Sequence, residues 1–134
     1  MGRPAVILLD THVLVWAVYD SKVLSRPAAS EIRRARRHGG LAVSAITVWE
    51  LATLFARGKI QAYGTIETSV RLLLEEVTIR PITPEIAALA TQFPEDYPHD
   101  PADCIIGATA RAEGLTLVTR DEKIRRSPLL KTVW

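Results

Sequence analysis

The sequence predicts an α/β fold, a three-layer α/β/α sandwich whose central twisted sheet is mainly parallel. Two observations lead to this fold class. Short apolar runs of strand length alternate along the chain with longer segments in which apolar residues recur at helical spacing. The 134 residues are 48% hydrophobic and 24% charged, a balance typical of one packed core, and no repeat or linker interrupts them. We therefore expect a single domain over residues 1–134.

The expected strands and helices alternate along the chain. A strand is expected over residues 4–9, because residues 6–9 form a continuous apolar run, as in a parallel strand that is covered on both faces. Further strands are expected at 41–43, 77–81, 115–119 and 131–134. Helices are expected from Thr11 onward, over 27–37, 45–57 and 65–76, from Pro84, over 101–113, and in a short basic segment after Asp121.

The helix boundaries are marked by capping residues. Ser44 can cap the helix that runs to about residue 57, which Gly58 ends. The segments Thr83-Pro84-Glu85 and Asp100-Pro101 each place a capping side chain before a first-turn proline. Gly114 ends the helix that Asp100 begins. These local signals predict where each helix starts and stops.

The composition excludes several classes of protein. A single cysteine, Cys104, rules out an internal disulfide framework and Cys-rich zinc modules. The apolar stretch at 5–9 is far shorter than the roughly 18 residues of a membrane span, and short for a signal-peptide core. We expect a protein of a reducing cytoplasm with no membrane partner.

Basic residues cluster although the net charge is only +2. One cluster is Arg33, Arg34, Arg36 and Arg37, and another near the C-terminus is Arg120, Lys123, Arg125 and Arg126. Such surfaces suit a polyanion such as nucleic acid, but a solvated helix face explains each cluster equally well.

Four acidic residues stand near the predicted strand ends. Asp10 directly follows the first strand, and Asp121 follows the fourth strand across one basic residue. Asp103 lies in the first turn of the helix that leads into that fourth strand. Glu50 lies almost two turns into the helix after the second strand. Ligands of doubly wound sheets bind beyond the carboxyl ends of the strands, so these four side chains are the candidates for a site.

Each acid also has a structural interpretation. Asp10 could cap the helix that follows it, and Asp121 could be an ordinary turn or cap residue. Asp103 could close a capping box begun by Asp100, for which we prefer the capping role outright. Glu50 could be a surface position, but its apolar neighbours leave few polar places, which favours a semi-buried acid with a function.

A convergence of these carboxylates would favour a bound cation. Like charges a few ångströms apart raise each other's pKa, and a divalent ion removes that cost. All-oxygen ligands favour Mg²⁺ or Mn²⁺ over zinc. Such an ion can activate a water and stabilise charge on a scissile phosphate, so the pattern predicts phosphodiester hydrolysis.

Other polar and aromatic residues are weaker signals. His12 could touch substrate, although a satisfied histidine at a helix start is commoner. Trp16, Trp49 and Trp134 could stack nucleobases, with burial or interface packing as the favoured alternative. Cys104 is expected to face the core.

Four segments occur in order along nearly the whole chain: LLDTH at 8–12, SAITVWEL at 44–51, DPADCIIGATA at 100–110 and LVTRD at 117–121. Together they resemble PIN-domain proteins of the VapC type, the toxins of bacterial and archaeal type II toxin–antitoxin pairs. The resemblance implies a PIN-like fold, Mg²⁺- or Mn²⁺-dependent endoribonuclease activity, a homodimer, and inhibition by a cognate VapB antitoxin.

The family's acids correspond to the same four residues, Asp10, Glu50, Asp103 and Asp121. The resemblance also implies that Thr11 and Thr119 help to hold the metal or its waters. Cys104 departs from the family pattern, because relatives often carry Arg there, and a lost basic contact would alter substrate handling without touching the metal ligands.

Two rival functions come from other classes. A receiver-like phosphorylation domain would carry adjacent acids after the first strand, where this chain has Asp10 alone. A non-catalytic module that binds RNA or an antitoxin would keep the same fold, charge and partner, and metal-dependent cleavage by the purified protein would exclude it.

Overall fold

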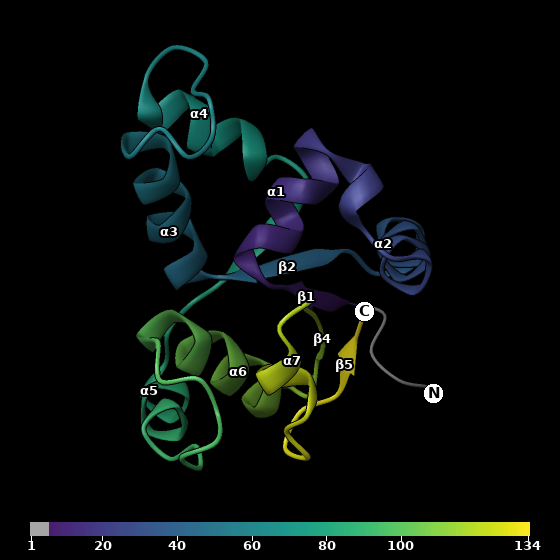
Figure 1. Ribbon diagram of the computed structural model, residues 1–134, viewed down its shortest axis with the longest axis vertical. Helices are drawn as coiled ribbons and strands as arrows, with labels where there is room; N and C mark the ends of the chain where they lie inside the picture. Colours follow the sequence, from purple (N-terminus) through teal and green to yellow (C-terminus); the bar gives the residue numbers. More distant parts are fainter. Residues whose placement is uncertain (1–5) are drawn as a thin grey trace.

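The strands form one parallel, five-stranded sheet (Figure 1). In the computed structural model, which describes residues 6–134, they are β1 (Ile7–Leu9), β2 (Leu41–Ser44), β3 (Val77–Arg80), β4 (Thr116–Val118) and β5 (Thr132–Val133). Their spatial order is β3-β2-β1-β4-β5, and each neighbouring pair is parallel. The predicted α/β class and parallel sheet are confirmed.

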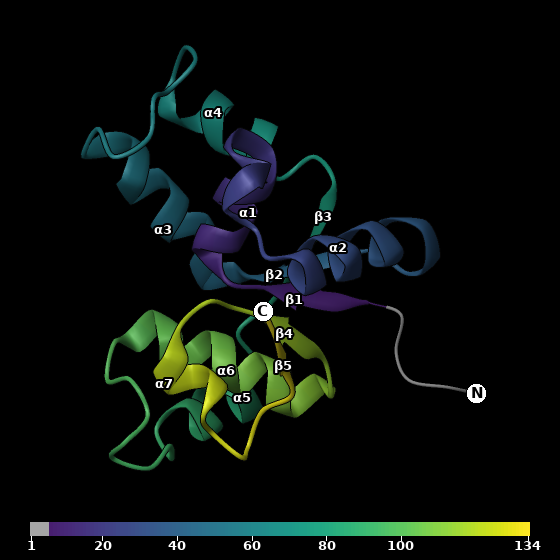
Figure 2. The same cartoon turned by 45° about the vertical axis from the view of Figure 1, so that its right-hand side comes forward.

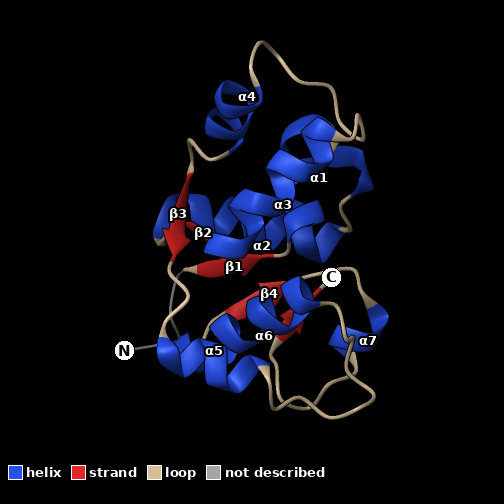
Figure 3. Cartoon of the chain, turned by 90° about the vertical axis from the view of Figure 1, so that its left-hand side faces the viewer, coloured by secondary structure: helices blue, strands red, loops and turns tan. Residues whose placement is uncertain are grey.

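Helices cover both faces of this sheet (Figures 2 and 3). One layer holds α1 (Thr11–Tyr19), α2 (Arg26–His38), α3 (Ala45–Ala56) and α4 (Ile66–Leu73). The other holds α5 (Pro84–Ala90), α6 (Pro101–Glu113) and α7 (Glu122–Arg125). The predicted three-layer arrangement is therefore confirmed.

Successive residues of β1 face opposite layers. Ile7 and Leu9 pack into the apolar cluster formed with α1 to α4, whereas Leu8 packs into the cluster formed with α6 and α7. All three side chains are at most 1% exposed. A strand in the middle of a sheet with helices on both faces has no solvent-facing side, which is why its sequence is a continuous apolar run.

The helix ends follow the local signals in the sequence. The Ser44 hydroxyl accepts a backbone amide in the first turn of α3, and the Thr83 hydroxyl does the same for α5. Asp100 caps α6. Gly114 ends α6 with a φ of 66°, in the left-handed region that glycine adopts without steric cost.

A few boundaries differ from the prediction. Helix α4 ends at Leu73 instead of residue 76, because residues 74–76 turn the chain into β3. Helix α2 starts at Arg26, and a short 3-10 helix at Ser21–Val23 was not predicted. Residues 4 and 5 of the predicted first strand lie outside the described residues. No helix in residues 6–134 combines the length and apolar character that a membrane span requires.

Candidate active site

A hydrogen bond between side chains joins the ends of β1 and β4. The Thr119 hydroxyl donates to Oδ2 of Asp10 over 2.8 Å, and Oδ1 of Asp10 accepts the Thr11 amide, also at 2.8 Å. The same Thr119 oxygen accepts the Asp121 amide at 3.2 Å. Thr119 is 0% exposed, so one buried hydroxyl fixes both the Asp10 carboxylate and the backbone at Asp121.

A second threonine orients Glu50. The Thr11 hydroxyl donates to Oε1 of Glu50 at 2.5 Å and lies 2.9 Å from the Thr47 hydroxyl. Because the Thr11 proton points to the carboxylate, the Thr47 hydroxyl is the donor of the second pair. Thr11 and Thr47 are both buried. The two threonines singled out in the sequence, Thr11 and Thr119, thus each orient one acid.

The Asp103 carboxylate takes no part in capping α6. Oδ1 of Asp100 accepts the amides of Ala102, at 2.8 Å, and Asp103, at 3.4 Å, so Asp100 has the capping role expected of it. Within residues 6–134, the Asp103 side chain does not return the reciprocal hydrogen bond of a capping box to Asp100. Its carboxylate is therefore available to the space in front of the sheet.

Asp121 caps α7 as well as facing that space. Its Oδ1 accepts the amides of Lys123 and Ile124, at 2.9 and 3.1 Å. Both bonds use the same oxygen, so the cap leaves the other carboxylate oxygen uncommitted. The structural and functional interpretations of Asp121 are compatible.

These acids line one cavity of about 430 Å³ at the carboxyl edge of the sheet. The structure brings together all four predicted side chains, which come from different elements: Asp10, Glu50, Asp103 and Asp121. A fifth carboxylate, Asp100, also lines it. The sequence signal for Asp100 was its spacing of three residues from Asp103, which puts both on one side of the first turn of α6.

Crowding of negative charge is clearest at Asp103. Burial is the largest effect, and the four other carboxylates of the cavity add to it, raising the pKa of Asp103 to about 7. Burial also raises the pKa of Asp10 and of Glu50. The hydrogen bonds from Thr119 and Thr11 oppose this rise, because they stabilise the charged form.

The acids surround an open space and do not form a closed cage. Within residues 6–134, no three acidic, histidine or cysteine side chains lie close enough to hold a metal ion by themselves. A tetrahedral zinc centre needs such a cage. Mg²⁺ keeps several waters and uses one or two carboxylates, so this donor set fits a hydrated divalent ion.

One wall of the cavity is aromatic and cationic. The Arg120 guanidinium lies 5.6 Å from the centre of the Trp16 ring, and the Trp16 and His12 rings are 5.9 Å apart. Arg120 and Trp16 were not among the predicted site residues. Their signals were present, because Arg120 precedes Asp121 and Trp16 lies one helical turn beyond His12.

The arginine cluster of α2 does not line this cavity. Arg34 pairs with Glu31 at 2.7 Å, and Arg36 pairs with Glu76 at 3.4 Å. Half of the cluster is thus already paired with acids of the chain, and its role in nucleic-acid binding stays a prediction.

Comparison with known proteins identifies the family. The model of the PIN domain family matches residues 7–128. The chain is 40% identical over 130 residues to Ribonuclease VapC22 of Mycobacterium tuberculosis, covering 96% of this chain and 98% of that protein. The chain belongs to the PIN-domain family, in its VapC group.

Solved structures agree with this PIN-domain fold. A toxin–antitoxin complex from Klebsiella pneumoniae matches with 25% identity and a TM-score of 0.66, covering 96% of each chain. A DNA-bound VapBC from Salmonella typhimurium matches with 18% identity and a TM-score of 0.72, covering 99% of this chain and 98% of that one. The second likeness is one of fold alone.

Proposed function

We propose that this PIN domain is a metal-dependent endoribonuclease, the toxin of a VapBC-type toxin–antitoxin pair, which hydrolyses RNA phosphodiester bonds. The observation that carries the proposal is the cavity of five carboxylates in a chain 40% identical to a ribonuclease. The proposed catalytic residues are Asp10, Glu50, Asp103 and Asp121.

Mg²⁺, or Mn²⁺ in its place, is the proposed ion. One or two of the four proposed catalytic carboxylates would bind it directly and the others through its waters, and their all-oxygen chemistry supports this choice. When bound, such an ion supplies an activated water and neutralises charge on the phosphate. Binding would also relieve the repulsion that raises the pKa of Asp103.

The chain's own side chains supply the positioning. The Thr119 hydroxyl holds Asp10 in one rotamer, and the Thr11 hydroxyl holds Glu50. In each bond the hydroxyl points its proton at one carboxylate oxygen, so the remaining lone pairs keep a fixed direction. Arg120 lines the same cavity without an acidic partner in residues 6–134, and it can attract a phosphate to a site that is otherwise negative.

We propose two protein partners, a VapB-type antitoxin and a second copy of this chain. The Klebsiella pneumoniae structure is a toxin–antitoxin complex, which supports the first. Large apolar side chains on α3 and near α4 are exposed, with Trp49 at 64% and Tyr63 at 56%, and such side chains are typical of protein interfaces.

The test is incubation of purified, antitoxin-free protein with total RNA in Mg²⁺ or Mn²⁺. Chelator and the Asp10→Asn variant should each abolish cleavage, whereas Asp20→Asn, at the exposed end of α1, should retain it. Discrete fragments with this pattern would support the proposal. A folded protein that binds the ion and cleaves no RNA would instead be the non-catalytic module.

A further inference from the structure

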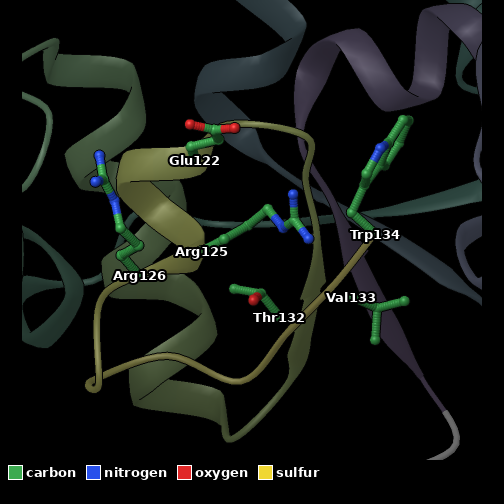
Figure 4. A pocket seen from close by; sticks show the side chains of 6 residues that line it. All are labelled: Glu122, Arg125, Arg126, Thr132, Val133 and Trp134. Carbon is green, nitrogen blue, oxygen red and sulfur yellow. The ribbon is translucent and has the colours of Figure 1, made fainter.

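A second cavity, of about 600 Å³, lies between α7 and the edge strand β5. Its lining is Glu122, Arg125, Arg126, Thr132, Val133 and Trp134. Figure 4 shows the Arg125 side chain extended from α7 across this space, with its guanidinium between the helix and Trp134. Arg126 also lines the cavity but leaves the helix on its other side, so Arg125 is the cation that extends across it.

This cavity adjoins the acidic one through a shared aromatic wall. Trp16 lines the acidic cavity and Trp134 lines the second, and their ring centres are 5.8 Å apart. The Arg120 guanidinium lies over the Trp16 ring, 5.6 Å from its centre. A chain-like ligand that leaves the acids at Asp121 would therefore pass a cation and two indoles before it reaches Arg125.

The cations along this path have no ion-pair partner among the residues that the structure describes. Among residues 6–134, neither Arg120 nor Arg125 makes an ion pair with a carboxylate, although Glu122 lines the same cavity as Arg125. Some arginines elsewhere are paired, for example Arg80 with Glu113 at 3.1 Å. An unpaired guanidinium that faces a cavity has its donors available to an external anion, and its fork matches two phosphate oxygens.

We propose that this second cavity binds a phosphate of the RNA strand beyond the scissile bond, with Arg125 as its principal ligand and the Trp16–Trp134 pair as a stacking surface for the intervening base. The inference rests on the proposed ribonuclease function and deepens it. The acidic cavity repels a phosphodiester chain, so the strand needs cations next to the acids to hold it in place. Base stacking on aromatic rings tolerates any sequence, which suits a general strand contact.

The two linked cavities favour a strand over a small anion. A free phosphate would need only Arg125 and the Thr132 hydroxyl, whereas the aromatic wall that continues to the acids matches a ligand of repeating phosphates and bases. An acidic segment of a protein partner could also bind Arg125. Binding experiments with RNA and with the antitoxin distinguish these two ligands.

The test measures RNA binding without cleavage. All proteins carry Asp10→Asn so that a fluorescein-labelled single-stranded RNA of about 12 nucleotides survives with Mg²⁺ present. Fluorescence anisotropy over about 50–200 mM salt gives the affinity and its salt dependence. The variants are Arg125→Ala and Arg125→Lys, and the control is Arg71→Ala, which removes one exposed arginine, paired with Glu67, from a helix that lines neither cavity.

We expect Arg125→Ala to weaken binding about five- to tenfold and to lower the slope of log K against log salt by about 0.7, the value for one phosphate contact on a single strand. Arg125→Lys should keep the slope, and Arg71→Ala should change neither quantity. Thermal melts check that each variant is folded.

Two results would overturn the inference. One is an Arg125→Ala protein that binds RNA with the affinity and slope of its parent, including the case in which neither binds. The other is an Arg125→Ala protein with unchanged RNA binding but weakened binding to the antitoxin, which would assign the cavity to a protein partner. RNA cleavage by the protein with Asp10 intact is scored separately, so failure of the proposed function leaves the binding result interpretable.

Discussion

Replacement of Thr119 by valine tests whether one buried hydroxyl organises the acidic site. Valine has the same shape but can neither donate to Oδ2 of Asp10 nor accept the Asp121 amide. The carboxylate would lose a charge-assisted hydrogen bond, and the backbone amide of Asp121 would lose its acceptor. We expect Thr119→Val to destabilise the protein and to leave Asp10 less firmly oriented.

The size of the loss follows from the charge on Asp10. A hydrogen bond to a charged group contributes about 1.5–3 kcal/mol, and the added methyl of valine returns about 0.8 kcal/mol. With the unpaired amide included, the net loss in unfolding free energy is about 2 kcal/mol. For a domain of 134 residues, that is a fall in melting temperature of about 7 °C.

The loss should depend on pH in one direction. The Thr119 hydrogen bond lowers the pKa of Asp10, against the larger effect of burial. Its removal raises the folded-state pKa further, so the variant is penalised where Asp10 is ionised. The difference between Thr119→Val and the unmodified protein should therefore be full at pH 8 and shrink as the pH falls through the pKa of Asp10.

Urea and thermal unfolding in chelator, over a series of pH values from 8 down to about 3, below the ordinary pKa of Asp, measure this difference. Thr119→Ser is the matched variant, because it keeps the hydroxyl and loses only a buried methyl, at a cost of about 1 kcal/mol that does not vary with pH. A valine variant as stable as the unmodified protein at pH 8, or one whose loss stays constant over the whole pH series, would refute the role assigned to Thr119.

Three further predictions concern Asp103, Gly107 and Ser44. The pKa of Asp103, near 7 when folded and near 4 when unfolded, means that the metal-free protein loses stability as the pH rises from 4 to 7, by about 1–2 kcal/mol after solvent screening. Melts in chelator should show this slope, and Asp103→Asn should flatten it. Gly107→Ala should lower the free energy of unfolding by about 1–3 kcal/mol, because the added Cβ would overlap the buried Tyr97 hydroxyl, which donates to the Asp103 carbonyl. Urea titration measures this loss. The control is Gly114→Ala, whose Cβ meets no neighbour, so that its loss reports backbone strain alone. Ser44→Ala should cost about 1 kcal/mol through loss of the α3 cap, and an unchanged urea midpoint would contradict that role.

Local signals in the sequence predicted most of the fold. Ser44, Thr83 and Asp100 each cap the helix that follows, and Gly114 ends α6 in a conformation that favours glycine. Such signals act within three or four residues, so they can be recognised in the sequence without knowledge of the tertiary contacts. The end of α4 was predicted less well, because the turn into β3 depends on where that strand must start.

The four acids could also be chosen from the sequence, since a parallel sheet gathers the residues at the carboxyl ends of its strands. The hydrogen bonds that orient these acids could not be predicted from the sequence. Thr11 and Glu50 are 39 positions apart in the sequence, and Thr119 and Asp10 are 109 positions apart. The contribution of Asp100 to the cavity was hidden behind its capping role, which is correct but incomplete.

The sequence by itself determined the class of fold, the helix ends and the acidic character of the site, because hydrophobic periodicity, capping and charge are properties of short segments. Only the tertiary structure decided that Trp16 contacts Trp134 and that Arg125 faces a cavity of its own. These contacts depend on β5 pairing with β4 at one edge of the sheet, which places the end of the chain beside α1. Strand order is set by the packing of the whole core, and no short segment encodes it.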